Sequence, residues 1–161
     1  MAEIYDITAS LEQVETIVRE ELDALRQKIV ENITRTGKRA SGRTQDSLVV
    51  NVTQEGGSVV GTIDGRAFFG ALETGSRPWR NQYARPPKFF IEIIEDWMRD
   101  KGMTGDAGGI AYTIMKRGSA QFRNGARTDV YSDDIVKTMD EINRRVGGLF
   151  EAQLIDSLLR N

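Results

Sequence analysis

Residues 48–64 read LVVNVTQEGGSVVGTID, and this stretch decides the fold of the chain. Leu48, Val50 and Val52 fall on one side of an extended chain, while the residues between them fall on the other. Alternation of this kind is typical of a β-strand with one buried face. The Gly-Gly pair in the middle supplies the positive φ values that a two-residue hairpin turn requires. The sequence therefore predicts two antiparallel strands joined by a tight turn.

A second turn signal, Asp64-Gly65, follows this hairpin, and another apolar run occupies residues 67–72. Asp-Gly is among the dipeptides most typical of tight hairpin turns. We therefore predict a meander of three antiparallel strands, at residues 48–53, 59–63 and 67–72.

Helical spacing precedes the meander. From Ser10 to about Ile33, apolar residues recur every three or four positions, as on one face of an amphipathic helix. Ser10 with Gln13 predicts a capping box at the start of this helix, and Gly37 predicts its end.

The C-terminal stretch shows the same spacing up to Leu159 and predicts a second long helix. Ser132 is its predicted N-cap, and two aspartates follow in the first turn, where carboxylates favour the helix dipole. Gly147-Gly148 interrupts the stripe at about 1 kcal/mol per glycine relative to alanine. The pair therefore predicts a kink or a close helix approach.

Between the meander and the C-terminal helix, residues 74–86 form a long predicted loop. Pro86-Pro87 then predicts the start of a helix that ends at Gly102. Trp97 is expected in the core on the apolar face of this helix. A glycine-rich joint leads to a short helix around Ile110–Met115 and then to a second basic loop.

Together these elements predict an α+β fold, in which an antiparallel β-meander packs against long N- and C-terminal helices, with a middle helical pair. Both terminal helices are expected on one face of the sheet. A length of 161 residues is typical of one globular unit, so residues 1–161 are predicted to form a single domain.

The chain contains no histidine and no cysteine, which excludes zinc sites, thiol nucleophiles, disulfides and histidine-dependent triads. Carboxylate chemistry with Mg²⁺ or Ca²⁺, or a lysine or tyrosine mechanism, stays open. The acidic residues at 129–134 lack EF-hand spacing and are explained by helix capping. Residues 105–109 lack a nucleotide-binding signature. We therefore expect no enzymatic activity, no cofactor and no metal.

The apolar runs are only a few residues long, whereas a membrane helix needs about 20. The first thirty residues are acidic and helical rather than signal-like. We therefore expect neither a membrane protein nor a secreted one.

The net charge is only −2, but the charges are unevenly distributed. Residues 32–45, 74–91 and 107–128 contain no acid, and the rest of the chain holds 10 bases against 24 acids. Such segregation indicates surfaces of opposite potential, suited to stacking of copies or to contact with a polyanion, although a chance enrichment of loops in bases is the alternative. The three segments contain four bases each: Arg35, Lys38, Arg39 and Arg43; Arg77, Arg80, Arg85 and Lys88; Lys116, Arg117, Arg123 and Arg127.

Aromatic residues are interleaved with these bases, chiefly Trp79 and Tyr83 in the loop at 74–86. Such a surface could neutralise phosphates while its aromatics stack on bases or anchor the loops. No DNA-reading motif is present, so any nucleic-acid contact is expected to be independent of sequence. We predict that the twelve bases, together with Trp79 and Tyr83, form an interface with another protein or with nucleic acid.

Several short motifs occur in a characteristic order. Ser41-Gly42-Arg43-Thr44-Gln45-Asp46-Ser47-Leu48 follows the first helix, Ala71-Leu72-Glu73-Thr74-Gly75 ends the predicted third strand, and Arg85-Pro86-Pro87-Lys88-Phe89-Phe90 starts the next helix. Together with residues 109–118 and 122–132, this succession resembles the neck or tail-completion proteins of tailed bacteriophages, which join head to tail. The resemblance covers most of residues 35–160.

The resemblance implies a structural, non-enzymatic virion protein that is made in the bacterial cytoplasm. It would work as a ring of six or twelve copies around the DNA channel, between portal or connector proteins and tail proteins. The twelve bases, with Trp79 and Tyr83, would then face this DNA channel or a neighbouring protein, and contact with packaged DNA would be independent of sequence. The alternative is a nucleic-acid-binding accessory protein that acts as a monomer or dimer, and a carboxylate-dependent enzyme is a more distant one.

Overall fold

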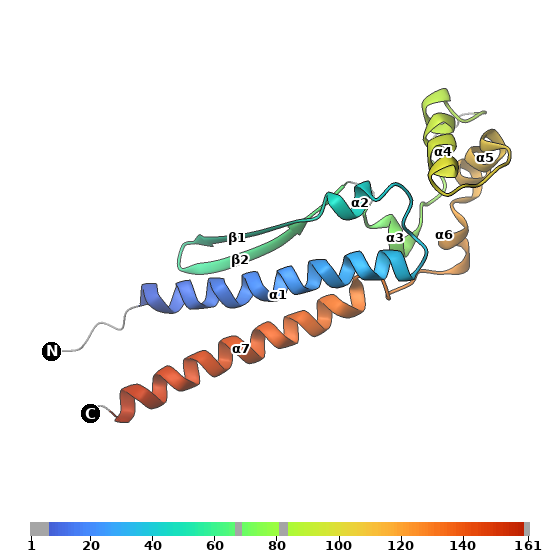
Figure 1. The fold of residues 1–161 in the computed structure, drawn as a ribbon. Coiled ribbons are helices and arrows are strands. Elements are labelled where there is room, and N and C mark those ends of the chain that lie inside the picture. The colour runs from blue at the N-terminus through green and yellow to red at the C-terminus, as the bar shows by residue number, and fades with distance from the viewer. Residues whose placement is uncertain (1–6, 67–68, 81–83, 160–161) are drawn as a thin grey trace.

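A computed structural model describes residues 7–66, 69–80 and 84–159 of the chain. Helices and strands are mixed, as predicted, and two long helices run along the molecule (Figure 1). In chain order the elements are α1 (Ile7–Arg35), α2 (Arg43–Asp46), β1 (Val49–Glu55), β2 (Ser58–Asp64), α3 (Ala71–Thr74), α4 (Lys88–Asp100), α5 (Ala107–Arg117), α6 (Ala120–Asn124) and α7 (Ser132–Leu159).

The hairpin of β1 and β2 forms as predicted. The strands are antiparallel, with Glu55 paired to Ser58 around the Gly56-Gly57 turn, whose φ values are 57° and 81°. Leu48 and Val52 are buried against α1 and Val50 between them is half-buried, whereas Val49 and Asn51 are exposed. Gly61 allows this close packing, because a Cβ atom there would lie 2.5 Å from Leu22 Cδ1.

The predicted third strand is wrong in the part that the structure describes, and residues 67 and 68 lie outside the described residues. Phe69 and Gly70 form a turn, and the helical turn α3 follows. Phe69 and Leu72 both pack against the core around Ile33. Because they are three residues apart, one helical turn places both on the same side, whereas a strand would direct them to opposite faces.

The terminal helices do not share one face of the sheet, which corrects the expected layering. The hairpin packs on α1, and α7 packs on another side of α1, so α1 lies between them (Figure 1). The helix α7 is continuous through Gly147-Gly148. Beyond the helix's own backbone, a Cβ atom on either glycine would meet no described atom within 4 Å, so the described residues make no close approach to this pair.

The ends of the long helices also differ from expectation. Because α1 begins at Ile7, Ser10 lies inside the helix, and the predicted capping box is wrong. Ser132 is the first residue of α7, but its amide is satisfied by the carboxylate of Glu73 from α3 rather than by a local cap.

A second small core lies between α4 and α5. Ile94 and Met98 pack against Ala107 and Ala111, and α4 starts after Pro87 and ends just before Gly102, as predicted. Trp97 is wrongly predicted as a core residue, because its side chain is 38% exposed. Ile94 and Met98, four residues apart, share the face toward α5, and Trp97 lies at the edge of this face, about 60° from Ile94 and about 100° from Met98 around the helix.

Candidate functional site at the junction of the two cores

The structure gathers the predicted basic residues at one end of the molecule. They lie at the end of α1, in and around α2, and between α3 and α7, away from the hairpin turn (Figure 1). Residues 36–48 and 66–131 carry 14 bases and 8 acids, a net charge of +6. The remaining residues carry 8 bases and 16 acids, a net charge of −8. The segregation along the sequence is therefore also a segregation between two parts of the fold.

Five of the predicted basic residues hold the fold together or pair locally. Arg35 donates to Asn32 and to the carbonyl of Asp129, and Arg123 donates to the carbonyl of Gly118. Ion pairs join Arg43 to Asp100, Lys88 to Glu92 and Arg127 to Asp129. These side chains are therefore partly neutralised by their own chain.

Five other arginines have no such partner. Their side chains make no hydrogen bond or ion pair within the part of the chain that the structure describes, and all five residues are exposed. Their guanidinium groups are available to a phosphate or a carboxylate of another molecule. They are Arg39, Arg77, Arg80, Arg85 and Arg117.

Trp79 anchors its loop rather than standing free. Its ring lies 4.8 Å from the ring of Phe90, and its backbone N–H donates to the carbonyl of Met115 at 2.9 Å. The residue thereby ties the loop to both α4 and α5. Lys116 lies over the ring of Tyr112, with 6.0 Å between its Nζ and the ring centroid. The predicted site residue Tyr83 lies outside the described residues.

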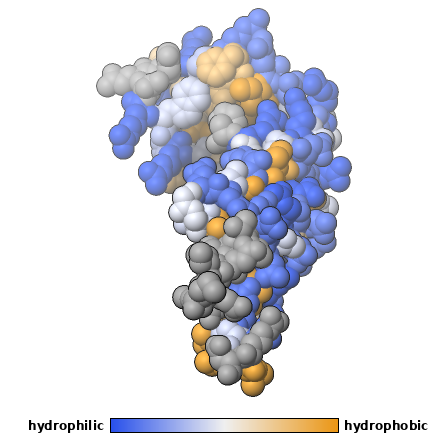
Figure 2. All heavy atoms as spheres, turned by 90° about the vertical axis from the view of Figure 1, so that its left-hand side faces the viewer, coloured by the Kyte–Doolittle hydropathy of each residue, from blue (hydrophilic) through white to orange (hydrophobic). Residues whose placement is uncertain are grey.

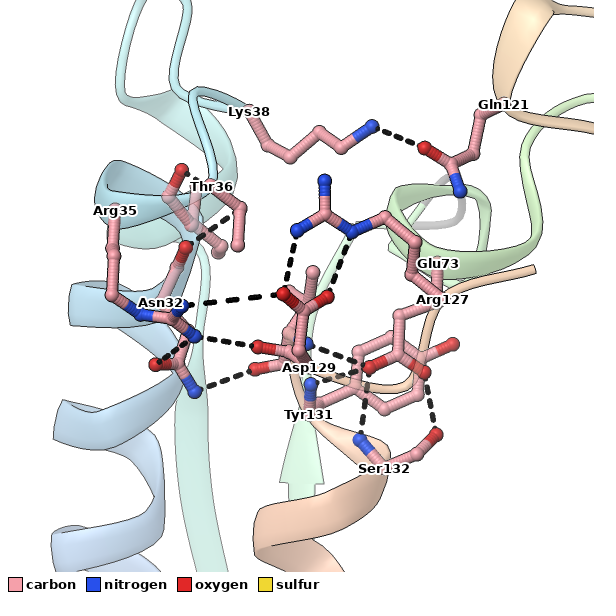
Figure 3. A network of polar contacts seen from close by, with 12 residues as sticks. Asn32, Arg35, Thr36, Lys38, Glu73, Gln121, Arg127, Asp129, Tyr131 and Ser132 are labelled. Atoms are coloured by element: carbon pink, nitrogen blue, oxygen red, sulfur yellow. Dashed lines mark hydrogen bonds and ion pairs between the residues drawn. The ribbon is translucent and has the colours of Figure 1, made fainter. Parts of the chain in front are cut away.

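A buried carboxylate links α3 to the start of α7. Glu73 is only 2% exposed, and its Oε1 accepts hydrogen bonds from the backbone N–H groups of Val130, Tyr131 and Ser132 (Figure 3). Its Oε2 accepts from the hydroxyl of Ser132. A carboxylate in this place satisfies amides that the first turn of a helix leaves without partners, and it complements the helix dipole.

The electrostatics of Glu73 follow from these contacts. Burial alone raises the pKa of its carboxyl, but the bonds from the Ser132 hydroxyl and the three amides favour the charged form and lower the pKa below its ordinary value. In the sequence, Glu73 is marked only as part of the motif at residues 71–75. Its spacing gave no signal of the role, because the partners lie 57 to 59 residues away.

A second buried polar residue ties α1 to the same place. Asn32 is 3% exposed and donates to the carbonyl of Val130 at 3.1 Å and to the carboxylate of Asp134 at 2.7 Å. Figure 3 shows Asn32 and Arg35 on one side of this chain segment and Glu73 on the other. The segment that connects α6 to α7 is therefore hydrogen-bonded to α1 on one side and to α3 on the other.

Beside this network lies a notch of about 450 Å³ between the α1–α3 end and α4. Trp97, Met103 and Leu72 give it apolar walls, and the ammonium groups of Lys38 and Lys101 belong to its lining. Lys38 donates to Gln121 Oε1 at 2.8 Å, and Lys101 donates to the carbonyl of Gly37 at 2.5 Å. Among the ion pairs of the described residues, neither lysine takes part.

The charge of the notch is poorly compensated. Burial lowers the pKa of Lys38 below its ordinary value, and the positive charges of Arg127 and Lys101 lower it further, while Asp129 acts in the opposite direction. An apolar wall beside two cations is suited to an acidic ligand that also carries an apolar group. Lys38 is among the interface residues predicted from the sequence, but Trp97 and Lys101 are not, since no local pattern joins α1 to α4.

Other kinds of site have no support in the described residues. No group of three or more carboxylates there could hold a metal ion. No helix in residues 7–66, 69–80 or 84–159 has the length and apolarity to cross a membrane. Comparison with known proteins adds no assignment, because no protein-family model, curated protein or solved structure matches this chain.

Proposed function

We propose that this chain is a structural subunit of the neck of a tailed bacteriophage. Six or twelve copies form a ring at the head–tail junction, around the DNA channel, between the portal or connector and the tail. The subunit acts by contact with its neighbours rather than by catalysis.

The observation that carries the proposal is the exposure of α7. None of its 28 residues, all of which the structure describes, is buried. A monomer rarely leaves so much apolar surface in contact with water, and such a surface marks an interaction site. Figure 2 looks toward the end of α7, and hydrophobic residues gather at the bottom of this view. The exposed large residues of α7 are Ile135, Val136, Met139, Phe150, Leu154, Ile155, Leu158 and Leu159.

The shape and the charges support the same proposal. The molecule is elongated, with the hairpin, α1 and α7 extending in one direction and α4 and α5 at the other end (Figure 1). A ring needs a heterologous interface, in which two different surfaces of one subunit complement each other. Poles of +6 and −8 on one chain provide that kind of complementarity.

The proposal is tested in a tailed phage that encodes this chain, by a nonsense mutation in its gene. A missing neck subunit leaves DNA-filled heads and separate tails, and the protein supplied in trans restores joined particles. Joined, infectious particles at the normal yield without the protein would overturn the proposal.

The second candidate is a nucleic-acid-binding accessory protein, and the five unpaired arginines favour it. Random duplexes would then bind alike, and affinity would fall steeply with added salt. Replacing Arg77, Arg80 and Arg85 by alanine would weaken binding. The matched control removes the same charge from the acidic part, at Arg26, Lys137 and Arg144. Tight salt-sensitive binding by a monomer, together with normal particles in the nonsense mutant, would favour this candidate over the neck protein.

A further inference from the structure

Two surfaces of this chain are incomplete, and they lie at opposite ends of the molecule. One is the last part of α7, residues 149–159, here called the α7 end segment. Five of its six large apolar side chains are 51–81% exposed: Phe150, Leu154, Ile155, Leu158 and Leu159. The other is the notch beside α4, where Trp97 and Met103 are 38% and 45% exposed. Each surface leaves apolar groups in contact with water.

The charges of the two surfaces are complementary. The α7 end segment contains Glu151 and Asp156 and no lysine or arginine; Arg160 follows it directly, so residues 149–161 carry a net side-chain charge of −1. The notch contains Lys38 and Lys101, for which the described residues supply no ion-pairing carboxylate. An acidic, apolar helix end therefore has the chemistry that the basic, apolar notch lacks.

The two surfaces of one molecule cannot meet. Ser132, the first residue of α7, is hydrogen-bonded to Glu73, and the neighbouring Leu72 lines the notch. The 28 residues of α7 rise by ~1.5 Å each and carry its far end about 40 Å away. Figure 1 shows α7 ending at the far side of the molecule from α4. Only the α7 end segment of a second copy can therefore reach the notch.

We propose that the α7 end segment of one copy docks in the notch of the next copy. Its apolar side chains cover Trp97 and Met103, and its carboxylates face Lys38 and Lys101. The contact is heterologous, so repetition gives a closed ring or an open chain of copies. This inference rests on the proposed ring and names the contact between neighbours within it.

The absence of natural cysteines makes a crosslinking test clean. One variant carries Met103→Cys and a second carries Leu158→Cys, and the two are mixed at high concentration and oxidised. We expect a disulfide-linked heterodimer from the mixture and at least tenfold less crosslinked product from either variant alone. The double variant should give a ladder of higher species. Ser58→Cys, at the exposed hairpin turn, replaces Leu158→Cys in the matched control and should not crosslink to Met103→Cys.

The charge part of the proposal is tested in the same system. Lys38→Glu with Lys101→Glu in the Met103→Cys background should lower the heterodimer yield by roughly tenfold, since removing complementary charges at an interface costs this much or more. Efficient crosslinking of Leu158→Cys alone would show that copies of α7 pair with each other, and it would overturn the proposal. So would a mixture that fails to crosslink both in solution and in purified particles.

The outcome is separable from that of the proposed function. Joined particles whose double variant forms no ladder would contradict this contact and leave the neck protein intact. A ladder formed by a protein that phage particles do not need would support the contact and contradict the neck protein.

Discussion

The two long helices are nearly equal in length, with 29 residues in α1 and 28 in α7, but they differ in burial. In α1, Val18, Leu25, Ile29 and Ile33 are buried, whereas no residue of α7 is. The difference arises because α1 has the hairpin on one side and α7 on another, while α7 contacts mainly α1. An amphipathic stripe therefore shows that a helix face needs a partner, but it does not show whether the same chain supplies it.

Truncating an apolar side chain should show the largest difference in stability between the two helices. Ile33 is 1% exposed, so Ile33→Ala should lower the free energy of unfolding by about 2–5 kcal/mol. Leu154 in α7 is 62% exposed, and Leu154→Ala should change it by less than about 0.5 kcal/mol. Urea denaturation at a concentration where the protein is monomeric measures both. Equal losses would mean that α7 is buried in the monomer after all.

The next largest loss of stability is expected from removing the carboxylate of Glu73, which caps the start of α7. Glu73→Gln keeps the shape of the side chain but removes the charge that three amides and a hydroxyl share, and we expect a loss of about 1–3 kcal/mol. Glu95→Gln, on the exposed face of α4, is the matched control and should stay within about 0.5 kcal/mol. An unchanged free energy of unfolding in Glu73→Gln would contradict the capping role of this carboxylate.

The same carboxylate makes stability depend on pH. Because the pKa of Glu73 is lowered in the folded state, its contribution is complete above the ordinary glutamate value of about 4.3. It is lost as the pH falls through the lower pKa of the folded protein. The difference in unfolding free energy between the parent and Glu73→Gln should therefore shrink between neutral and acid pH. A difference that does not depend on pH would show that the charge is not what stabilises this contact.

Replacing either of two glycines by alanine should change the stability, but in opposite directions. Gly61→Ala places a Cβ atom 2.5 Å from Leu22 Cδ1 and 2.7 Å from Val18 Cγ1, so it should destabilise the monomer by about 1–3 kcal/mol. Gly147→Ala meets no described atom within 4 Å and should stabilise α7 by about 1 kcal/mol. Thermal unfolding of the two variants compares a packed position with an open one. Destabilisation by Gly147→Ala would reveal a packing contact in α7.

The smallest effect is expected at the ion pairs that join the two helices. Arg145 of α7 lies 2.7 Å from carboxylate oxygens of both Glu20 and Glu21 in α1. Because these groups are partly exposed, Arg145→Ala should change stability less than Ile33→Ala, Glu73→Gln or either glycine variant, and the change should shrink at high salt. A large effect that persists in salt would indicate that these pairs order α7 against α1.

Two elements were predicted correctly from local signals, whereas the local capping signal at Ser10 was wrong because α1 already includes that residue. The hairpin follows from alternation and the Gly56-Gly57 turn, and the start of α4 follows from Pro86-Pro87. Prediction from sequence also failed where distant parts of the chain decide. Phe69 and Leu72 adopt a helical turn because both pack on the α1 core, and Trp97 is exposed because Ile94 and Met98 face α5.

The candidate site shows the same limit. The basic segments were visible as gaps in the distribution of acids, and the structure gathers them at one end of the fold. Glu73, Asn32 and Lys101 act through partners 57 or more residues away, so neither composition nor spacing could identify them.

The central claim is that neighbouring copies supply what α7 lacks. It is tested most directly by an image reconstruction of a tailed phage particle that contains this chain. The account predicts a ring of copies at the head–tail junction around the DNA channel, with the end of each α7 seated beside α4 of the next copy. A single copy, no copy at the junction, or a ring in which the last turns of α7 remain bare would contradict it.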